Sequence, residues 1–194
     1  RGGASDPTDR DRGHLAAIPA CAHQATSLPA PVWSGPYGWS MTLWSDEATI
    51  EVAAPAEHLY ALVSDVTRMG EWSPACYRCE WLSASDGPQI GGRFRGHNKF
   101  NGARWSRECV VTAAAPGREF GFTTMFRGEE STRWRYTFEP TAGGTRVTER
   151  YEVAGVPPWI KLVRMLPGMP AKSLRDGQQS MQVTLQRLKA AAEV

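Results

Sequence analysis

The sequence has few of the residues from which metal sites and covalent active sites are built. Only four histidines and four cysteines occur among its 194 residues. The histidines have no ligand-like spacing, and the sequence contains no GxGxxG, Walker, HExxH or GxSxG motif. One CxxC pair, Cys76 and Cys79, has no second pair to complete a zinc site. The sequence therefore predicts neither a bound metal nor a cofactor.

The CxxC pair also does not fit a thioredoxin-like site, which would place it at the start of a helix. It lies in ACYRCEWL, which is typical of a strand. Residues three apart in a regular strand point to opposite faces, so the two thiols are expected to be separated. We interpret the cysteines as structural and reduced, which favours a reducing cytoplasm.

Strong charge and long apolar runs are absent as well. The net charge is +2, and the basic residues on the predicted outer face alternate with acidic neighbours such as Glu108 and Glu152. This excludes a strong general attraction to nucleic acid. No apolar run approaches the ~18 residues that cross a bilayer. We expect no nucleic-acid partner and no integral membrane segment, and oligomeric state stays open.

The first 40 residues differ in composition from the rest. They are rich in Gly, Pro, Ala and Ser and show no amphipathic periodicity, so 1–40 is predicted to be disordered. Three aromatic residues, Trp33, Tyr37 and Trp39, favour loose docking instead. Met41 is a candidate natural start, and 41–194 is predicted to form one domain.

Periodicity in the remaining chain predicts one strand, two short helices, six more strands and a long helix. The strands are expected at 48–54, 76–82, 92–100, 103–114, 118–126, 132–140 and 145–153. The short helices cover 56–65 and 66–72, and the last helix runs from Ser173 to Ala192, with Pro170 stopping any earlier helix. The expected fold is α+β: a curved seven-stranded antiparallel sheet wrapped around the C-terminal helix, with a cavity between them.

Four stretches carry a family resemblance: IEVAAPAEHLYALVSDVTRMGEWSP, GGRFRGHNKF, PGREFGF and GGTRVTERYEV. Their order and spacing over 48–192 resemble the helix-grip superfamily of START-like and birch-pollen-allergen-like proteins. The nearest branch is the bacterial polyketide cyclase/dehydrase and lipid-transport (SRPBCC) family. The resemblance implies a deep apolar cavity for a lipid- or polyketide-like molecule. It implies no universal catalytic motif, because some members are enzymes and many are carriers.

Strand alternation selects the residues that face this expected cavity. Tyr77 and Trp81 share one face with Cys79, and Arg107 and Glu149 are the charged residues that point inward. Buried charges need partners, so we predict that Arg107 and Glu149 form an ion pair that orients a polar group of the ligand. The alternative is a bulge in the strand 103–114 that places Arg107 in water.

The aromatic residues have two interpretations, as core and as cavity wall, which nearly coincide in this fold. The last helix adds Gln178, Met181 and Leu185 from its apolar stripe. The full set of ligand-binding candidates is Trp72, Tyr77, Trp81, Asn98, Trp105, Arg107, Phe122, Trp134, Tyr136, Glu149, Tyr151, Gln178, Met181 and Leu185.

The predicted function is binding of a hydrophobic small molecule, without metal or cofactor. One alternative is a cyclase/aromatase- or dehydratase-type enzyme in which Glu149, or Tyr136 with Arg107, acts as acid or base. A second is a docking module: the segment 157–170 combines basic, aromatic and apolar residues suited to a partner or to transient membrane contact, although a lid over the pocket is the commoner use. The sequence leaves the ligand and the presence of catalysis open.

Overall fold

The computed structural model describes residues 44–84, 86–100, 102–154 and 169–193, with side chains from 169 to 176 and at 100 left out. Every described residue lies in one compact unit, Trp39–Val194. The predictions made for 1–40, for Met41 and for a lid or docking role of 157–170 lie outside the described residues.

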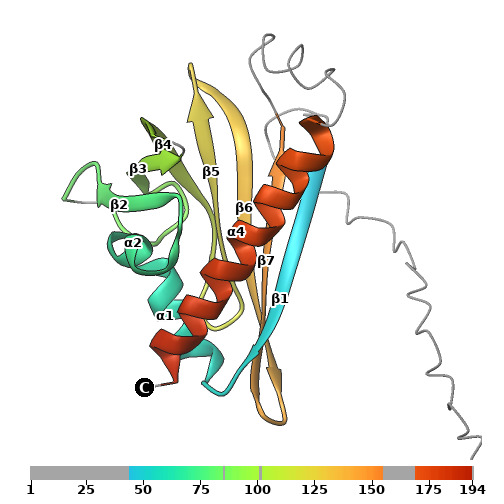
Figure 1. Cartoon of the computed structure of the whole chain (residues 1–194). Coiled ribbons are helices and arrows are strands. Elements are labelled where there is room, and N and C mark those ends of the chain that lie inside the picture. The colour runs from blue at the N-terminus through green and yellow to red at the C-terminus, as the bar shows by residue number, and fades with distance from the viewer. Residues whose placement is uncertain (1–43, 85, 101, 155–168, 194) are drawn as a thin grey trace, which may run out of the picture. The chain divides into compact units, whose positions relative to one another are not determined.

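Seven strands form one antiparallel sheet with the order β1-β7-β6-β5-β4-β3-β2. Two short helices and a 3₁₀ turn follow β1, and a long helix ends the chain (Figure 1). In chain order the elements are β1 (Trp44–Val52), α1 (Ala56–Ser64), η1 (Val66–Arg68), α2 (Met69–Trp72), β2 (Cys76–Trp81), β3 (Arg93–Phe100), β4 (Ala103–Ala115), β5 (Glu119–Phe126), β6 (Glu129–Thr141), β7 (Gly144–Val153) and α4 (Met169–Ala192). The predicted helix-grip α+β fold is confirmed.

Helix α4 lies diagonally across one face of the curved sheet, which we call the inner face (Figure 1). It buries Met181, Leu185 and Leu188 in a single core with inward side chains of the sheet. The helix begins at Met169, four residues before the predicted start. Pro170 therefore lies in its first turn, where the missing N–H costs no intrahelical hydrogen bond, and does not stop the helix.

Strand β7 shows how the sequence pattern produces this core. From Thr145 to Val153 every second residue is buried, and the residues between them are more exposed. This is the alternation expected of a strand with one covered face. It places Glu149, the one carboxylate among these inward residues, in the middle of the inner face.

Strand β2 departs from regular alternation. Its pairing with β3 shifts register between Cys76 and Arg78, so the strand contains an irregularity of the β-bulge type. Cys76 and Cys79 are both buried as a result, whereas Tyr77 is 43% exposed. The prediction that the two cysteines point to opposite faces is wrong, and so is the inward assignment of Tyr77, because both assumed an unbroken strand.

Candidate functional site

A tyrosine and a glutamate meet in the middle of the inner face. Tyr136 on β6 and Glu149 on β7 are direct cross-strand partners. The Tyr136 hydroxyl donates a hydrogen bond of 2.7 Å to Oε1 of Glu149. The two side chains are only 4% and 3% exposed, so this polar pair is enclosed by the apolar core.

The second carboxyl oxygen of Glu149, Oε2, is buried without a hydrogen-bond partner among the described residues. Burial raises the pKa of Glu149 to about 8, against the opposing effect of the hydrogen bond from Tyr136. Burial also raises the pKa of Tyr136 well above its usual value. At neutral pH the carboxyl is mainly protonated, and since Oε1 already accepts from Tyr136, its proton belongs on Oε2. The inner face thus holds a buried O–H donor that lacks an acceptor.

A row of aromatic rings extends across the inner face beside this pair. Neighbouring ring centroids are 5.2 to 6.5 Å apart along the row. Trp81, Phe94, Phe122, Trp134 and Tyr151 form the row, on β2, β3, β5, β6 and β7 respectively. The predicted candidates Trp81, Phe122, Trp134 and Tyr151 therefore do come together. Such a row suits a flat apolar molecule, and it also serves as ordinary core packing.

The predicted ion pair between Arg107 and Glu149 does not form. Arg107 lies on β4, and β5 and β6 separate that strand from β7. Its Nη1 donates to the carbonyl oxygen of Ser106 at 3.1 Å, and its guanidinium lies 4.9 Å from the ring centroid of Phe126. Alternation alone gave both residues the same face, but the order of strands in the sheet sets the distance between them.

The alternative explanation, a bulge in the fourth strand that places Arg107 in water, is not confirmed. An irregularity does occur in β4, between Val111 and Ala113. It comes after Arg107, which keeps the parity of the buried Cys109 and stays half-buried in the first half of the strand.

Two further predicted contacts are more exposed than expected. Trp105 is 39% exposed near the start of β4, and Gln178 is exposed on α4. On the helix, the residue one turn before Met181 that faces the sheet is Gly177, where a Cβ would lie 2.8 Å from the hydroxyl oxygen of Tyr151. Gln178 follows it by one residue, about 100° around the helix, and therefore points away.

The remaining candidates occupy the positions predicted for core residues. Trp72 is 2% exposed and belongs to the core cluster, as do Met181 and Leu185. Asn98 is half-buried on β3 and donates through Nδ2 to the carbonyl oxygen of Gly96 at 3.3 Å. These residues complete the inner face without adding a second charged group beside Glu149.

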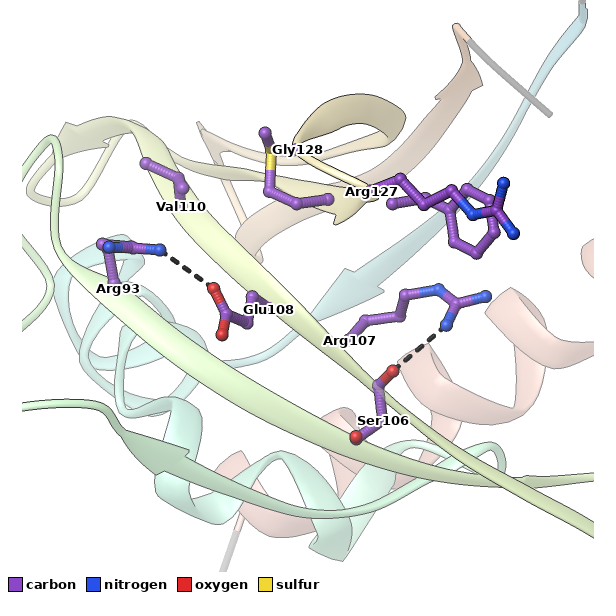
Figure 2. A pocket seen from close by; sticks show the side chains of 9 residues that line it. Arg93, Ser106, Arg107, Glu108, Val110, Arg127 and Gly128 are labelled. Atoms are coloured by element: carbon purple, nitrogen blue, oxygen red, sulfur yellow. Dashed lines mark hydrogen bonds and ion pairs between the residues drawn. The ribbon is translucent and has the colours of Figure 1, made fainter. Parts of the chain in front are cut away.

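An open pocket of about 450 Å³ lies beside the start of β3, the middle of β4 and the end of β5, and Arg107 is one of its lining residues (Figure 2). Its wall includes Glu108 and Val110, which alternate with the buried Cys109 and Val111 and so face away from α4. Figure 2 shows Arg93 bonded to Glu108, at 2.9 Å, within this wall. None of its lining residues that the structure describes belongs to α4, so the cavity expected between the sheet and α4 stays a prediction.

One close pair of reactive groups was not predicted from the sequence. The thiols of Cys76 and Cys79 lie 3.2 Å apart in the core. The CxxC motif was a usable signal, but the bulge that unites the thiols could not be read from it. Among the described residues no group of three or more His, Cys, Asp or Glu side chains is arranged to hold a metal ion. Within the same residues, no helix is long and apolar enough to span a membrane.

Comparison with solved structures identifies similar folds. A START superfamily protein from Mycobacterium smegmatis is 21% identical, with 77% of this chain and 97% of that chain covered and a TM-score of 0.58. The di-domain ARO/CYC protein StfQ of the steffimycin biosynthetic pathway is 18% identical, with 77% and 50% covered and a TM-score of 0.61. A Polyketide_cyc-like protein from Corynebacterium glutamicum, Cgl2372, is 31% identical, with 77% and 88% covered and a TM-score of 0.49.

No curated protein matches the sequence. At the family level, however, residues 44–193 match the family described as polyketide cyclase / dehydrase and lipid transport. The match includes every strand and helix of the described domain. The predicted resemblance is therefore confirmed, and the chain belongs to the polyketide cyclase/dehydrase and lipid transport family.

Proposed function

We propose that this protein binds a hydrophobic small molecule carrying a carbonyl or similar acceptor, between the inner face of the sheet and α4. The observation that carries the proposal is the buried Oε2 of Glu149, which has no hydrogen-bond partner in the part of the chain that the structure describes. An unsatisfied buried polar group lowers the free energy of unfolding by about 1–3 kcal/mol, so the presence of one in the core calls for an explanation. A ligand oxygen that accepts the Glu149 proton supplies one.

The neighbouring side chains agree with such a ligand. Trp134 is half-buried, and its ring centroid lies 5.3 Å from that of Tyr151 and 6.5 Å from that of Phe122. Apolar walls with a few placed polar groups are the usual composition of small-molecule sites. The residues proposed to contact the ligand are Trp81, Phe122, Trp134, Tyr136, Glu149 and Tyr151, with Met181 and Leu185 from α4.

A matched pair of probes tests this proposal: anthraquinone, which has carbonyl oxygens, and anthracene, which has none. Quenching of tryptophan fluorescence reports binding of each. The wild-type protein should bind the quinone about threefold to tenfold more tightly, as one neutral hydrogen bond provides. Glu149→Met should abolish this preference while Glu129→Met, at an exposed position on β6, retains it. Equal affinity of the wild type for both probes, or a preference that survives Glu149→Met, would refute the proposal.

Catalysis is the second candidate function, and one observation favours it. A carboxyl group with a pKa of about 8 is well matched to proton transfer near neutral pH. Cyclisation or dehydration of a polyketide requires such an acid or base. The ARO/CYC protein BexL has a similar fold, with 19% identity and a TM-score of 0.60, and this likeness is a reason to test the chemistry here. In this version Glu149 transfers the proton and Tyr136 holds the carboxyl in place.

Native mass spectrometry of the protein purified from its own host separates carrier from enzyme. A carrier should retain a hydrophobic ligand through purification. An enzyme should carry no ligand after purification but should convert an added linear poly-β-ketone. Glu149→Gln should reduce the rate of that conversion by about 100-fold or more. An unchanged rate in Glu149→Gln would exclude the catalytic version.

A further inference from the structure

Two thiols at the edge of the sheet are placed for chemistry with each other. Cys76 Sγ and Cys79 Sγ lie 3.2 Å apart, both below 10% exposure. Two residues separate them along the chain, and the register shift between Cys76 and Arg78 turns both side chains to the same face. A disulfide bond is about 2.05 Å long, so closure requires the sulfurs to approach by roughly 1 Å.

The surroundings leave room for this small movement. Gly96, on the neighbouring strand, lies opposite the thiol pair, and a Cβ there would sit 3.6 Å from each sulfur. The Sδ of Met69 on α2 lies 3.8 Å from Cys79 Sγ. The sulfurs therefore contact a glycine and a flexible thioether, both of which adapt to a shift at little cost.

The two thiols also differ in acidity. The hydrogen bond from Cys79 lowers the pKa of Cys76, while the same bond and burial raise the pKa of Cys79. Cys76 therefore ionises to the thiolate more readily, whereas Cys79 stays protonated. This is the division between an attacking and a resolving cysteine.

We propose that Cys76 and Cys79 are a redox-sensitive dithiol that hydrogen peroxide converts into a reversible disulfide. The Cys76 thiolate attacks one peroxide oxygen, the O–O bond breaks, and the departing hydroxide takes up a proton to leave as water. Sulfur of the Cys79 thiol then attacks the sulfenic acid on Cys76, forming the S–S bond and breaking the S–O bond. The Cys79 proton leaves with that oxygen as a second water, so two thiols and one peroxide yield one disulfide and two waters.

Access to the oxidant follows from the position of β2. It is the last strand in the sheet order, and its outer edge has no strand partner among the described residues. Edge strands separate locally from a domain at lower free energy than central ones. Hydrogen peroxide is close to water in size, so a brief opening of β2 suffices.

Cys109 supplies an internal control. It is 3% exposed on β4, and burial raises the pKa of its thiol to about 12. Its sulfur approaches the carbonyl oxygen of Arg107, at 3.9 Å. A thiol with so little thiolate is expected to react slowly with peroxide.

The test uses the full chain carrying Cys21→Ser, exposed to hydrogen peroxide, then alkylated in denaturant and digested with trypsin. Cleavage after Arg78 separates the two cysteines, so a disulfide must join peptides 69–78 and 79–93 into one species. We expect this species to form in the native protein, to vanish on treatment with dithiothreitol, and to be unaffected by Cys109→Ser. Cys76→Ser and Cys79→Ser should each prevent it.

The result that overturns the proposal is alkylation of both Cys76 and Cys79 at a peroxide dose that already oxidises Cys109. Over-oxidation of Cys76 to a sulfinic acid with Cys79 still alkylated would also overturn it, because the resolving step would have failed. Since Cys76, Cys79 and Cys109 are all present in the chain carrying Cys21→Ser, the outcome does not depend on how variants at those three positions fold. The test is also independent of ligand binding at Glu149.

Discussion

The hydroxyl of Tyr136 donates to one oxygen of Glu149 at 2.7 Å, and the other oxygen is buried with no partner from 44–84, 86–100, 102–154 or 169–193. The bond joins two directly opposed residues of β6 and β7, so neither side chain can turn away without disturbing the core. This half-satisfied carboxyl is the most unusual polar group of the inner face. It can donate a hydrogen bond to a ligand. When no ligand is bound, it lowers the free energy of unfolding of the domain.

The raised pKa of Glu149 predicts a pH-dependent stability. Below about pH 4.5 the carboxyl is protonated in both folded and unfolded chains. Between about pH 4.5 and 8 only the unfolded chain ionises, so the free energy of unfolding falls as pH rises, by up to ~1.4 kcal/mol per pH unit. Glu149→Gln should remove this slope, as measured by urea unfolding at several pH values.

Glu129→Gln, at an exposed position, is the matched control and should keep the wild-type profile. If wild type and Glu149→Gln changed in parallel between pH 5 and 8, the carboxyl would not be held neutral in the folded protein.

Removing the partner hydroxyl should destabilise the domain. Tyr136→Phe keeps the ring in the core but leaves Glu149 with no hydrogen bond from Tyr136. A loss of about 1–3 kcal/mol in the free energy of unfolding is expected, together with a further rise in the pKa of Glu149. Urea unfolding measures the first effect and a pH series the second. Tyr77→Phe, on the exposed side of β2, should change neither.

The absence of an ion pair between Arg107 and Glu149 predicts that their substitutions are independent. The unfolding free energies of Arg107→Ala and Glu149→Gln should add to within about 0.5 kcal/mol in the double variant. The cycle of Tyr136→Phe with Glu149→Gln should show a clear interaction energy, because those two side chains are bonded. A coupling larger than 1 kcal/mol between positions 107 and 149 would contradict the register described here.

Close approach of α4 to β7 depends on Gly177. A side chain there would meet the Tyr151 hydroxyl, so Gly177→Leu is expected to reduce the free energy of unfolding by about 1–3 kcal/mol. Gln178→Leu, one residue further on the exposed side, should stay within about 0.5 kcal/mol of wild type. Thermal or urea unfolding compares the pair, and equal effects would show that the glycine is not needed for packing.

Much of this architecture could be predicted because it depends on local periodicity. The two-residue alternation in β7 and the heptad-like stripe Met181, Leu185 and Leu188 in α4 follow from the geometry of single elements. The order of strands and helices, and with it the family, could be recognised on the same basis. These predictions are confirmed because each depends only on residues that are close together in the sequence.

The candidate site could be predicted only in part. Alternation correctly turned Tyr136, Glu149 and most of the aromatic row inward, but it could not say which inward groups touch. Strand register makes Tyr136 the partner of Glu149, and strand order places Arg107 three strands away. Hydrogen bonding between strands fixes that register, and no single strand contains it.

What the sequence by itself determined is the set of elements and, where a strand is regular, the face on which its side chains lie, since both depend on backbone geometry within an element. The tertiary structure alone decided the contacts: the partner of Glu149, the helix position of Gly177 against Tyr151, and the meeting of Cys76 with Cys79 across a bulge. Each of these is a distance between backbones set by packing and register, which one-residue shifts change completely.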